Sequence, residues 1–594
     1  MKRGNLENWE DLSGCQNLLL FSQLVNELLF DYSIPSNRVS TLNSHFLCLD
    51  AINAINSIEE HGVPEGTLKP IMEELYSALG KDPVFDKVSI KPIEYFLKYQ
   101  VDKYIISRPH EMSYADLKRC ALAINTYFFV DDNYYKKLRD MIIEIIERNN
   151  LYEQKKLFRL IKSMLTELMN MGYSLKYIYG VMRKIFWEPE TPIVSPKLIR
   201  DFFDNFSLEK GEYEVICVVK KSSKKKYIAS IEGMVCEDRV KPRTKSKVEK
   251  EFLNVTNGKG FIRIKIKSLD YFKAADECKK IMSDTFALYR LYDHKFRYDI
   301  YKADIGVYYN NKFYKISKKN VAPLEHIKML STYQLTKGLS QYGKALESLW
   351  KKSYGDFISI VNAARFHSNS LDSSSKENQL LDLWAIFESV LDISNAHTSD
   401  RIIQVCMYLV PIIKRGYIYS LFEQLANDIK NYNLDLYIDI VGENSDGDVV
   451  VRKISEWVLL ENHKRDDFIQ NCHDFPLLKE RIQYYHEELS DTSKVYNFVE
   501  KHAERVKWQV MRIYRNRNLI IHNADSMPYL ELLIENLHSY VDAFLEYSIN
   551  NLANEHTIES MCQNLFIKEC KWVSNFRKNK QAIDESKIEM MLSI

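Results

Sequence analysis

The chain lacks the features that mark several common classes of protein. None of its ten cysteines forms a Cys-x-x-Cys pair, which argues against a zinc ribbon and against a disulfide framework. No Gly-rich loop of the Walker type is present, so the sequence does not support ATP use. Apolar runs fall short of the about 18 residues that cross a membrane, and Met1 to Asn8 leads into a polar stretch rather than a signal-peptide core. We therefore expect a cytoplasmic protein with no membrane partner.

An excess of charge of one sign is also absent. The 82 basic and 81 acidic residues give a net charge of +1, so the chain as a whole does not have the charge of a nucleic-acid-binding protein. Any RNA-binding site must then be local. At 594 residues the chain exceeds a single hydrophobic core, and we expect a mainly α protein of three domains, 1–205, 206–325 and 326–594.

The first domain, 1–205, has the apolar periodicity of helices joined by short turns. Prolines at 35, 64, 83 and 109 separate the helical segments, and three prolines between Trp187 and Pro196 predict a hinge. The helices that we predict are Leu18 to Phe30, Leu42 to Ile58, Leu68 to Leu79, Tyr114 to Phe129, Tyr134 to Glu147 and Glu153 to Met171.

The second domain, 206–325, is rich in Val, Ile, Tyr and Phe in partly alternating order, which predicts strands and a small α+β domain. A helix from Leu269 to Arg290 interrupts the strands, and Tyr309 to Lys312 has the composition of a hairpin turn. The strands that we predict are Glu212 to Lys221, Tyr227 to Cys236, Gly260 to Lys267, Tyr298 to Ala303 and Ile305 to Ile316.

This domain also contains the densest basic cluster of the chain. Two interpretations stay open: solvated loops around strands, or a surface that follows an RNA backbone. The cluster consists of Lys220, Lys221, Lys224, Lys225 and Lys226, followed by Lys241, Arg243, Lys245, Lys247 and Lys250.

The third domain, 326–594, returns to helical periodicity and contains the stretch Arg515 to His522, with the sequence RNRNLIIH. Arg517 occupies a position in the apolar stripe of its helix, so its charge needs a carboxylate, a phosphate or a water-filled cleft. Asn518 lies one helical turn before His522 and can hold its imidazole. A break at Asn523 and Ala524 leaves His522 at the end of the helix.

Purely structural interpretations compete with a site at this stretch. The C-terminal end of a helix favours a histidine through its dipole and its free carbonyls, and Arg517 could form a salt bridge to Glu388 inside the bundle. A second Arg-x-x-x-x-His match, Arg481 to His486, has isoleucine after its arginine, and we interpret it as coincidental.

The run Trp508 to Asn523 resembles the Arg-Asn-x-x-x-His motif of HEPN domains, in particular the ApeA-like HEPN proteins of bacterial anti-phage defence. The segment Asp382 to Leu391, with Glu388 inside an apolar helix, resembles the earlier bundle helix of that family, and Tyr529 to Ile549 resembles its closing helix. The resemblance covers roughly residues 340–552 and implies an up-down helical bundle.

The resemblance implies a metal-independent endoribonuclease without a cofactor, in which the 2′-hydroxyl of RNA attacks the adjacent phosphate. It assigns catalysis to Arg517, Asn518 and His522, and supporting roles to Arg512, Arg515 and Glu388.

HEPN nucleases usually pair two motifs across a twofold axis, and this chain has one convincing copy. We therefore expect a homodimer, with Trp508, Met511 and Arg515 as candidate contacts, unless Arg481 and His486 form a degenerate second half-site. The residues before 320 are expected to sense a phage-derived trigger or to restrain the dimer. The alternative is a catalytically silent HEPN scaffold that binds RNA or protein.

Overall fold

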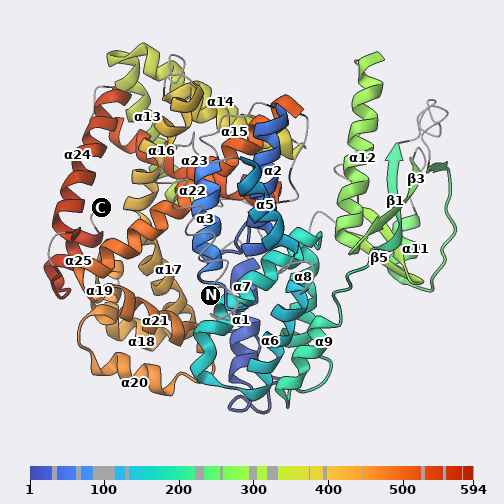
Figure 1. The fold of residues 1–594 in the computed structure, drawn as a ribbon, viewed down its shortest axis with the longest axis horizontal. Helices are drawn as coiled ribbons and strands as arrows, with labels where there is room; N and C mark the ends of the chain where they lie inside the picture. The colour runs from blue at the N-terminus through green and yellow to red at the C-terminus, as the bar shows by residue number, and fades with distance from the viewer. Residues whose placement is uncertain are drawn as a thin grey trace. The chain divides into compact units, whose positions relative to one another are not determined.

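The computed structural model describes residues 1–29, 37–61, 68–84, 114–126, 133–220, 233–254, 259–292, 294, 304–316, 332–373, 375–391, 398–443, 445, 447–523, 527, 529–552, 557–577 and 580–592. It is mostly helical, with 73% helix and 8% strand, and it contains one small antiparallel sheet in the middle of the chain (Figure 1). The predicted mainly α fold with a small α+β region is confirmed.

The chain divides into two compact units. The first unit comprises Met1–Glu167, Pro192–Pro196 and Leu324–Ile594, and the second comprises Leu168–Thr191 and Lys197–Pro323. The N-terminal helices and the C-terminal helices thus share one unit. That 1–205, 206–325 and 326–594 each fold by themselves stays a prediction.

The predicted N-terminal helices all appear, with ends shifted by a few residues, because each carries an apolar stripe of helical period. The helical elements up to Met171 are α1 (Gln16–Leu29), α2 (Ser44–His61), α3 (Leu68–Leu79), α5 (Tyr114–Ile124), α6 (Tyr134–Arg148), η5 (Leu151–Glu153) and α7 (Gln154–Met171). The last turn of α7 belongs to the second unit.

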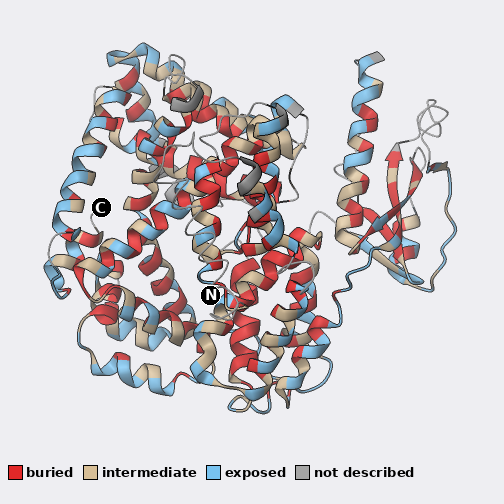
Figure 2. Cartoon of the chain, viewed as in Figure 1, coloured by how far each residue is buried: buried red, intermediate tan, exposed pale blue. Residues whose placement is uncertain are grey.

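Helix α1 is buried on nearly every side (Figure 2), although six of its 14 residues are polar. Buried polar side chains need hydrogen-bond partners, and several of those on α1 have one. Asn17 donates from Nδ2 to the carbonyl of Asn150 at 3.0 Å, and Gln23 accepts from the backbone N–H of Leu477 at 3.2 Å. The bond to Leu477 joins the start of the chain to α21 in its C-terminal part.

The C-terminal part of the first unit is helical throughout its described residues. Its helices are α13 (Thr332–Lys352), α14 (Tyr354–Asp372), α15 (Lys376–Val390), α16 (Thr398–Arg415), α17 (Tyr417–Tyr432), α18 (Leu434–Val441), α19 (Gly447–Leu459), α20 (His463–Asn471), α21 (Pro476–Glu488), α22 (Thr492–Asn523), α23 (Leu530–Leu552), α24 (Ile558–Arg577) and α25 (Glu585–Leu592).

One stretch, Arg401–Tyr432, is long and apolar enough by composition to cross a membrane. It consists of two consecutive helices, α16 and α17, and half of its apolar window is buried inside the first unit. The core helices of soluble proteins can have the same length and composition, so one such stretch is weak evidence for a membrane span.

The second unit is built on a five-stranded antiparallel sheet with the order β2-β3-β1-β4-β5. The long central pair runs in continuous register from Gly211 opposite Ser268 to Lys220 opposite Lys259. The elements of this unit are α8 (Leu175–Met182), the π-helix η6 (Arg183–Trp187), η7 (Pro196–Leu198), α9 (Ile199–Phe203), β1 (Gly211–Lys220), β2 (Met234–Glu237), α11 (Lys247–Leu253), β3 (Lys259–Ser268), α12 (Tyr271–Tyr292), β4 (Ile305–Tyr309) and β5 (Lys312–Ile316).

The predicted hairpin turn between β4 and β5 is confirmed. Asn310 and Asn311 have φ angles of 46° and 59°, the left-handed conformation that a two-residue turn between twisted strands requires and that asparagine tolerates. Helices α8, α9 and α11 were not predicted, because each is too short to show a clear period. The predicted strand Tyr298 to Ala303 lies outside the described residues, as does most of Tyr227 to Cys236.

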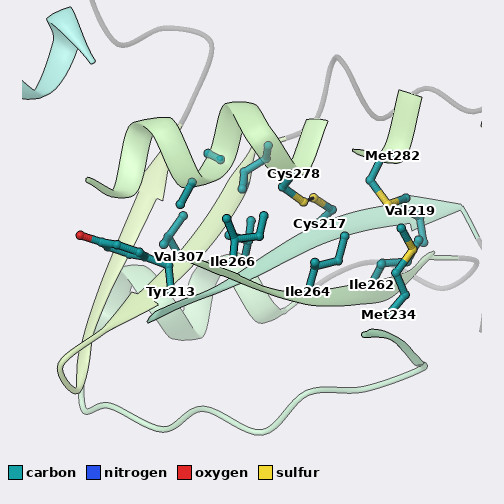
Figure 3. Packing of buried hydrophobic residues seen from close by; sticks show 14 of the residues in the cluster. Tyr213, Cys217, Val219, Met234, Ile262, Ile264, Ile266, Cys278, Met282 and Val307 are labelled. Atoms are coloured by element: carbon teal, nitrogen blue, oxygen red, sulfur yellow. Dashed lines mark hydrogen bonds between the residues drawn. The ribbon is translucent and has the colours of Figure 1, made fainter. Parts of the chain in front are cut away.

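Helix α12 covers one face of the sheet and closes an apolar core with it (Figure 3). Alternate residues of β1 and β3, such as Val215 and Ile264, meet Ala274 and Cys278 from the helix. The thiols of Cys217 and Cys278 are 3.4 Å apart and both are buried, so they form a weak hydrogen bond within the core rather than a disulfide.

Asp270 fixes the start of α12. Its buried carboxylate accepts hydrogen bonds from the backbone N–H groups of Phe272 and Lys273 at 2.8 and 2.9 Å, and from the backbone N–H and hydroxyl of Ser174 at 2.7 and 3.0 Å. One carboxylate thus caps α12 and holds the first turn of α8 beside it.

We predict that Asp270→Ala destabilises α8 and α12 by about 2 kcal/mol, because a buried cap is lost and several donors are left without an acceptor. Hydrogen exchange measured by mass spectrometry should show faster exchange in both helices. Asp276→Ala, which removes an exposed carboxylate paired with Lys279 on the same helix, should leave the exchange unchanged. Equal exchange in the two variants would contradict the assigned role.

Candidate functional site

Helix α22 carries the predicted site and is the longest element of the chain, with 32 residues. Asp491 begins it by accepting a hydrogen bond from the backbone N–H of Lys494 at 2.9 Å. Val506, Val510 and Ile513 form a buried stripe, and the helix contacts α3, α15, α16, α23 and α24. A helix packed on so many sides holds the side chains along its buried length in fixed positions.

Arg517 and Glu388 form the ion pair that was one of the structural alternatives left open by the sequence. The guanidinium Nη2 donates to Glu388 Oε1 at 3.2 Å, and their side chains are 23% and 32% exposed. The indole N–H of Trp384, one turn before Glu388 on α15, donates to the same oxygen at 3.0 Å. Glu388 is less deeply buried than its apolar neighbours predicted, so the pair lies at the edge of the bundle and remains open to solvent.

Asn518 extends this chain of hydrogen bonds. Its Oδ1 accepts from Arg517 Nη1 at 3.1 Å, so the amide is oriented by the guanidinium. Its Nδ2 has no acceptor among the described residues. Asn518 and His522 are one helical turn apart and share a face of α22, although no hydrogen bond joins them.

His522 is the penultimate residue of α22 and is exposed. Within the described residues it makes no hydrogen bond and no ion pair. The structure therefore brings Arg517, Asn518 and Glu388 into one connected group and leaves the His522 imidazole accessible at the end of the same helix. That His522 joins this group in one reaction centre stays a prediction.

Arg512 and Arg515, the predicted supporting residues, point instead to the N-terminal helices (Figure 1, α2 and α3 in blue, α22 in orange). Arg515 Nη2 lies 2.6 Å from Asp50 Oδ2 of α2, and Arg512 pairs with Glu74 of α3. Arg512 Nε is 3.7 Å from Asp50, so the aspartate lies between the two guanidinium groups.

This ionic cluster, formed by Asp50, Glu74, Arg512 and Arg515, is largely withdrawn from water. The Arg512 and Asp50 side chains are only 4% and 7% exposed. Burial alone would lower the pKa of Arg512, but the charges of Glu74 and Asp50 raise it, so the guanidinium stays charged. The Tyr529 hydroxyl, 3.5 Å from Asp50, closes the cluster. Arg512 and Arg515, which precede the motif on α22, thus form structural contacts.

Sequence reasoning missed Asp50 and Glu74. One signal was available for Asp50, which follows Leu47 and Cys48 and precedes Ala51 and Ile52, all of them buried. A carboxylate within such an apolar run needs a cation. The sequence gives no indication of which arginine provides it.

The second Arg-x-x-x-x-His match has structural contacts. Arg481 Nη2 lies 2.6 Å from Glu27 Oε2 in a pair with side chains 7% and 0% exposed. His486 Nδ1 is 2.9 Å from the carbonyl oxygen of Val458 and 3.0 Å from Arg465 Nη1. Both residues are held by helices of the first unit, which fits the interpretation of a coincidental match.

The basic cluster of the second unit is only partly described. Lys221, Lys224, Lys225 and Lys226 lie outside the described residues, and the side chain of Lys220 is likewise not described. Arg243 is bound to the sheet, with its guanidinium nitrogens 3.1 and 2.8 Å from the Glu214 carboxylate. Within the second half of the basic cluster, from Lys241 to Lys250, Arg243 therefore has a structural role. Lys247 and Lys250 lie on α11 rather than on a loop.

Comparison of the chain with family models, with curated proteins and with solved structures found no match. Among the described residues, no group of three or more His, Cys, Asp or Glu side chains is placed to hold a metal ion. The candidate site thus consists of residues of α22 and α15.

We predict that Arg512→Ala lowers the free energy of unfolding by about 3–5 kcal/mol, because it leaves Glu74 without its cation and removes one of the two guanidinium groups beside the buried Asp50. Urea denaturation followed by circular dichroism measures this change. The control is Arg452→Ala, which breaks an exposed pair with Glu456 on α19 and should cost less than about 1 kcal/mol. Similar losses in the two variants would contradict the role given to the ionic cluster.

Proposed function

We propose that the chain is a metal-independent endoribonuclease of the HEPN type that acts in the cytoplasm in anti-phage defence. The observation that carries the proposal is the arrangement at the end of α22: Arg517 and Asn518 in one hydrogen-bonded group with Glu388, and an exposed His522 one turn further on. These groups can bind a phosphate and transfer protons.

The proposed reaction needs no nucleophile from the protein. The 2′-oxygen of RNA attacks the adjacent phosphorus, the bond to the 5′-oxygen breaks, and the products are a 2′,3′-cyclic phosphate and a 5′-hydroxyl. One proton leaves the 2′-hydroxyl and another reaches the departing 5′-oxygen. A histidine is suited to such transfers, since its ordinary pKa is about 6.5, and His522 is the accessible one at this site.

Arg517 would stabilise the negative charge of the crowded phosphate. A guanidinium has five N–H donors, and Glu388 and Asn518 each accept from one nitrogen of Arg517. The remaining donors can form paired hydrogen bonds to phosphate oxygens, as guanidinium geometry favours. Glu388, itself held by Trp384, would keep the guanidinium in position rather than touch the substrate.

A homodimer would supply the second copy of the motif. Arg515, one of the predicted contacts, pairs with Asp50 of its own chain, so the proposed contact narrows to Trp508 and Met511, both of which are half-buried. A twofold axis near the end of α22 would bring two His522 side chains to one cleft.

The N-terminal region would restrain the enzyme until infection. The ionic cluster that joins α2 and α3 to α22 supports this role, because a trigger of phage origin that moves α2 or α3 would also act on the helix that carries the motif.

The alternative is a catalytically silent HEPN scaffold that binds RNA or protein. The ion pair of Arg517 with Glu388 favours it, since a paired arginine has a sufficient structural reason to be present. The two functions differ in a single measurable property, which is RNA cleavage.

We predict that His522→Ala lowers the rate of RNA cleavage by at least about 100-fold, the usual contribution of a general acid or base, while the fold is kept because the side chain is exposed. Incubation of the purified chain with total RNA measures this, and circular dichroism checks the fold. His473→Ala, at another exposed histidine of the same unit, should retain full activity. Equal cleavage by wild type and His522→Ala would refute the assignment.

His486→Ala tests the second half-site in the same assay, and we expect unchanged cleavage, because His486 contacts a backbone carbonyl and Arg465. Loss of cleavage by a folded His486→Ala variant would make Arg481 and His486 part of the reaction centre.

We also predict the chemical requirements of cleavage. Because the proposed nucleophile is the substrate's own 2′-hydroxyl and arginine meets the developing charge, cleavage should persist in excess EDTA and leave 5′-hydroxyl ends. DNA and 2′-O-methyl RNA should remain uncut. A strict magnesium requirement, or cleavage of 2′-O-methyl RNA, would rule out the proposed chemistry.

A further inference from the structure

Five cations from segments far apart in the sequence gather on the first unit. They are Lys81, which follows α3, Arg159 and Lys162 of α7, and Lys501 and Arg505 of α22. Helices α3 and α21 both pack against α22, and Lys155 of α7 pairs with Glu487 of α21, so these segments are neighbours. The charges of Lys501, Arg505 and Arg159 act on Lys81, and the charge of Arg505 acts on Lys162. Four of them are exposed and Lys162 is half-buried. We call this group the cationic surface.

None of the five forms an ion pair within the described residues. Other cations on the same helices do: Lys155 of α7 lies 2.6 Å from Glu487, and Arg512 of α22 pairs with Glu74. The nearest carboxylates compensate only in part. Glu504 acts on Lys81, and Glu27, which acts on Lys162, is already paired with Arg481. In a chain of net charge +1, this local excess is not a consequence of composition.

The gathering of these charges has an electrostatic cost. Burial lowers the pKa of Lys162 to about 8, and repulsion from Arg505 and Arg481 adds to the effect. Burial also lowers the pKa of Lys81, and the positive charges of Lys501 and Arg505 lower it further. An anion bound among these side chains would relieve the repulsion, so the surface is better suited to a bound polyanion than to solvent alone.

An exposed aromatic ring lies against α22. Tyr484 of α21 is 44% exposed, its ring centroid is 6.1 Å from that of Phe498 of α22, and the charges of Glu488 and Arg505 both act on it. Cations that follow a phosphate backbone beside an aromatic ring on which a base can stack are the combination by which proteins hold single-stranded nucleic acids. An acidic protein would use the charges but would not need the ring.

We propose that the cationic surface, together with Tyr484, binds the backbone and one base of single-stranded RNA. The choice of RNA over DNA rests on the proposed ribonuclease function. The geometry fits a substrate that reaches the motif, because Arg505 and His522 lie on one continuous helix, about 25 Å apart along its axis at about 1.5 Å per residue. RNA held at the cationic surface would thus extend toward the exposed end of α22.

We predict that Lys501→Ala/Arg505→Ala weakens RNA binding and flattens its salt dependence. With His522→Ala present in every protein to prevent cleavage, fluorescence anisotropy of a labelled RNA of about 20 nucleotides, longer than the roughly 4–16 that such surfaces cover, gives the affinity at several salt concentrations. Two lost phosphate contacts should lower the slope of log affinity against log salt by about 1.4.

The matched control is Arg148→Ala/Lys155→Ala, which removes two exposed cations already paired with Glu144 and Glu487. It has the same change in net charge and should keep the slope. A slope unchanged in Lys501→Ala/Arg505→Ala, or lowered equally in the control, would overturn the proposal.

Tyr484→Ala distinguishes a nucleic acid from another polyanion. Loss of stacking should weaken RNA binding about tenfold with no change in the salt slope, because stacking releases no counterions. Unchanged affinity in Tyr484→Ala would overturn the assignment to RNA and leave an acidic protein as the partner.

Binding and cleavage are read separately. If the surface binds RNA as described while the protein with His522 intact does not cleave it, the ribonuclease proposal fails alone. If that protein cleaves RNA while the affinity for RNA does not change in Lys501→Ala/Arg505→Ala, the proposal for the cationic surface fails and the ribonuclease proposal stands.

Discussion

The buried ionic cluster between α22 and the two N-terminal helices α2 and α3 is the constraint on which the first unit depends. Two arginines and two carboxylates are largely withdrawn from water there, and the loss of one of them would leave a buried charge without its partner. A packing of apolar residues tolerates small shifts, whereas an ion pair buried in this way does not. The cluster therefore fixes how α2 and α3 lie against α22 and couples any movement of them to that helix.

This contact divides α22 into sections with different surroundings. Before it, Lys501 and Arg505 are exposed beside other cations and have no paired carboxylate within the described residues. After it, Arg517 and Asn518 lie at the edge of the bundle, and His522 is open to solvent. The same helix thus provides a structural anchor in its middle and accessible polar groups on both sides, which supports the proposal that it holds a long substrate against a short reactive segment.

The sequence predicted the helices well because apolar periodicity reports directly on burial, and it predicted the Asn310–Asn311 turn because few residues adopt left-handed backbone. The Arg517–Glu388 pair was one of the alternatives that the sequence indicated, because both charges interrupt apolar stripes of their helices. The sequence did not predict the pairing of Arg515 with Asp50, because the two residues are far apart in the chain and no local pattern indicates that α2 lies against α22. The cationic surface was missed for the same reason, as its members come from separate helices.

The two Arg-Asn dipeptides show how far local sequence can determine a role. Arg515-Asn516 and Arg517-Asn518 are identical in composition, yet two positions along a helix rotate a side chain by about 200°. The first arginine therefore meets Asp50 in the interior, and Asn516 is buried with its amide donating to the carbonyl of Arg512 at 3.0 Å. The second arginine meets Glu388 at the surface, and Asn518 keeps its amide N–H donors without an acceptor among the described residues. Which copy can reach a substrate is thus decided by the neighbours of the helix and not by the motif.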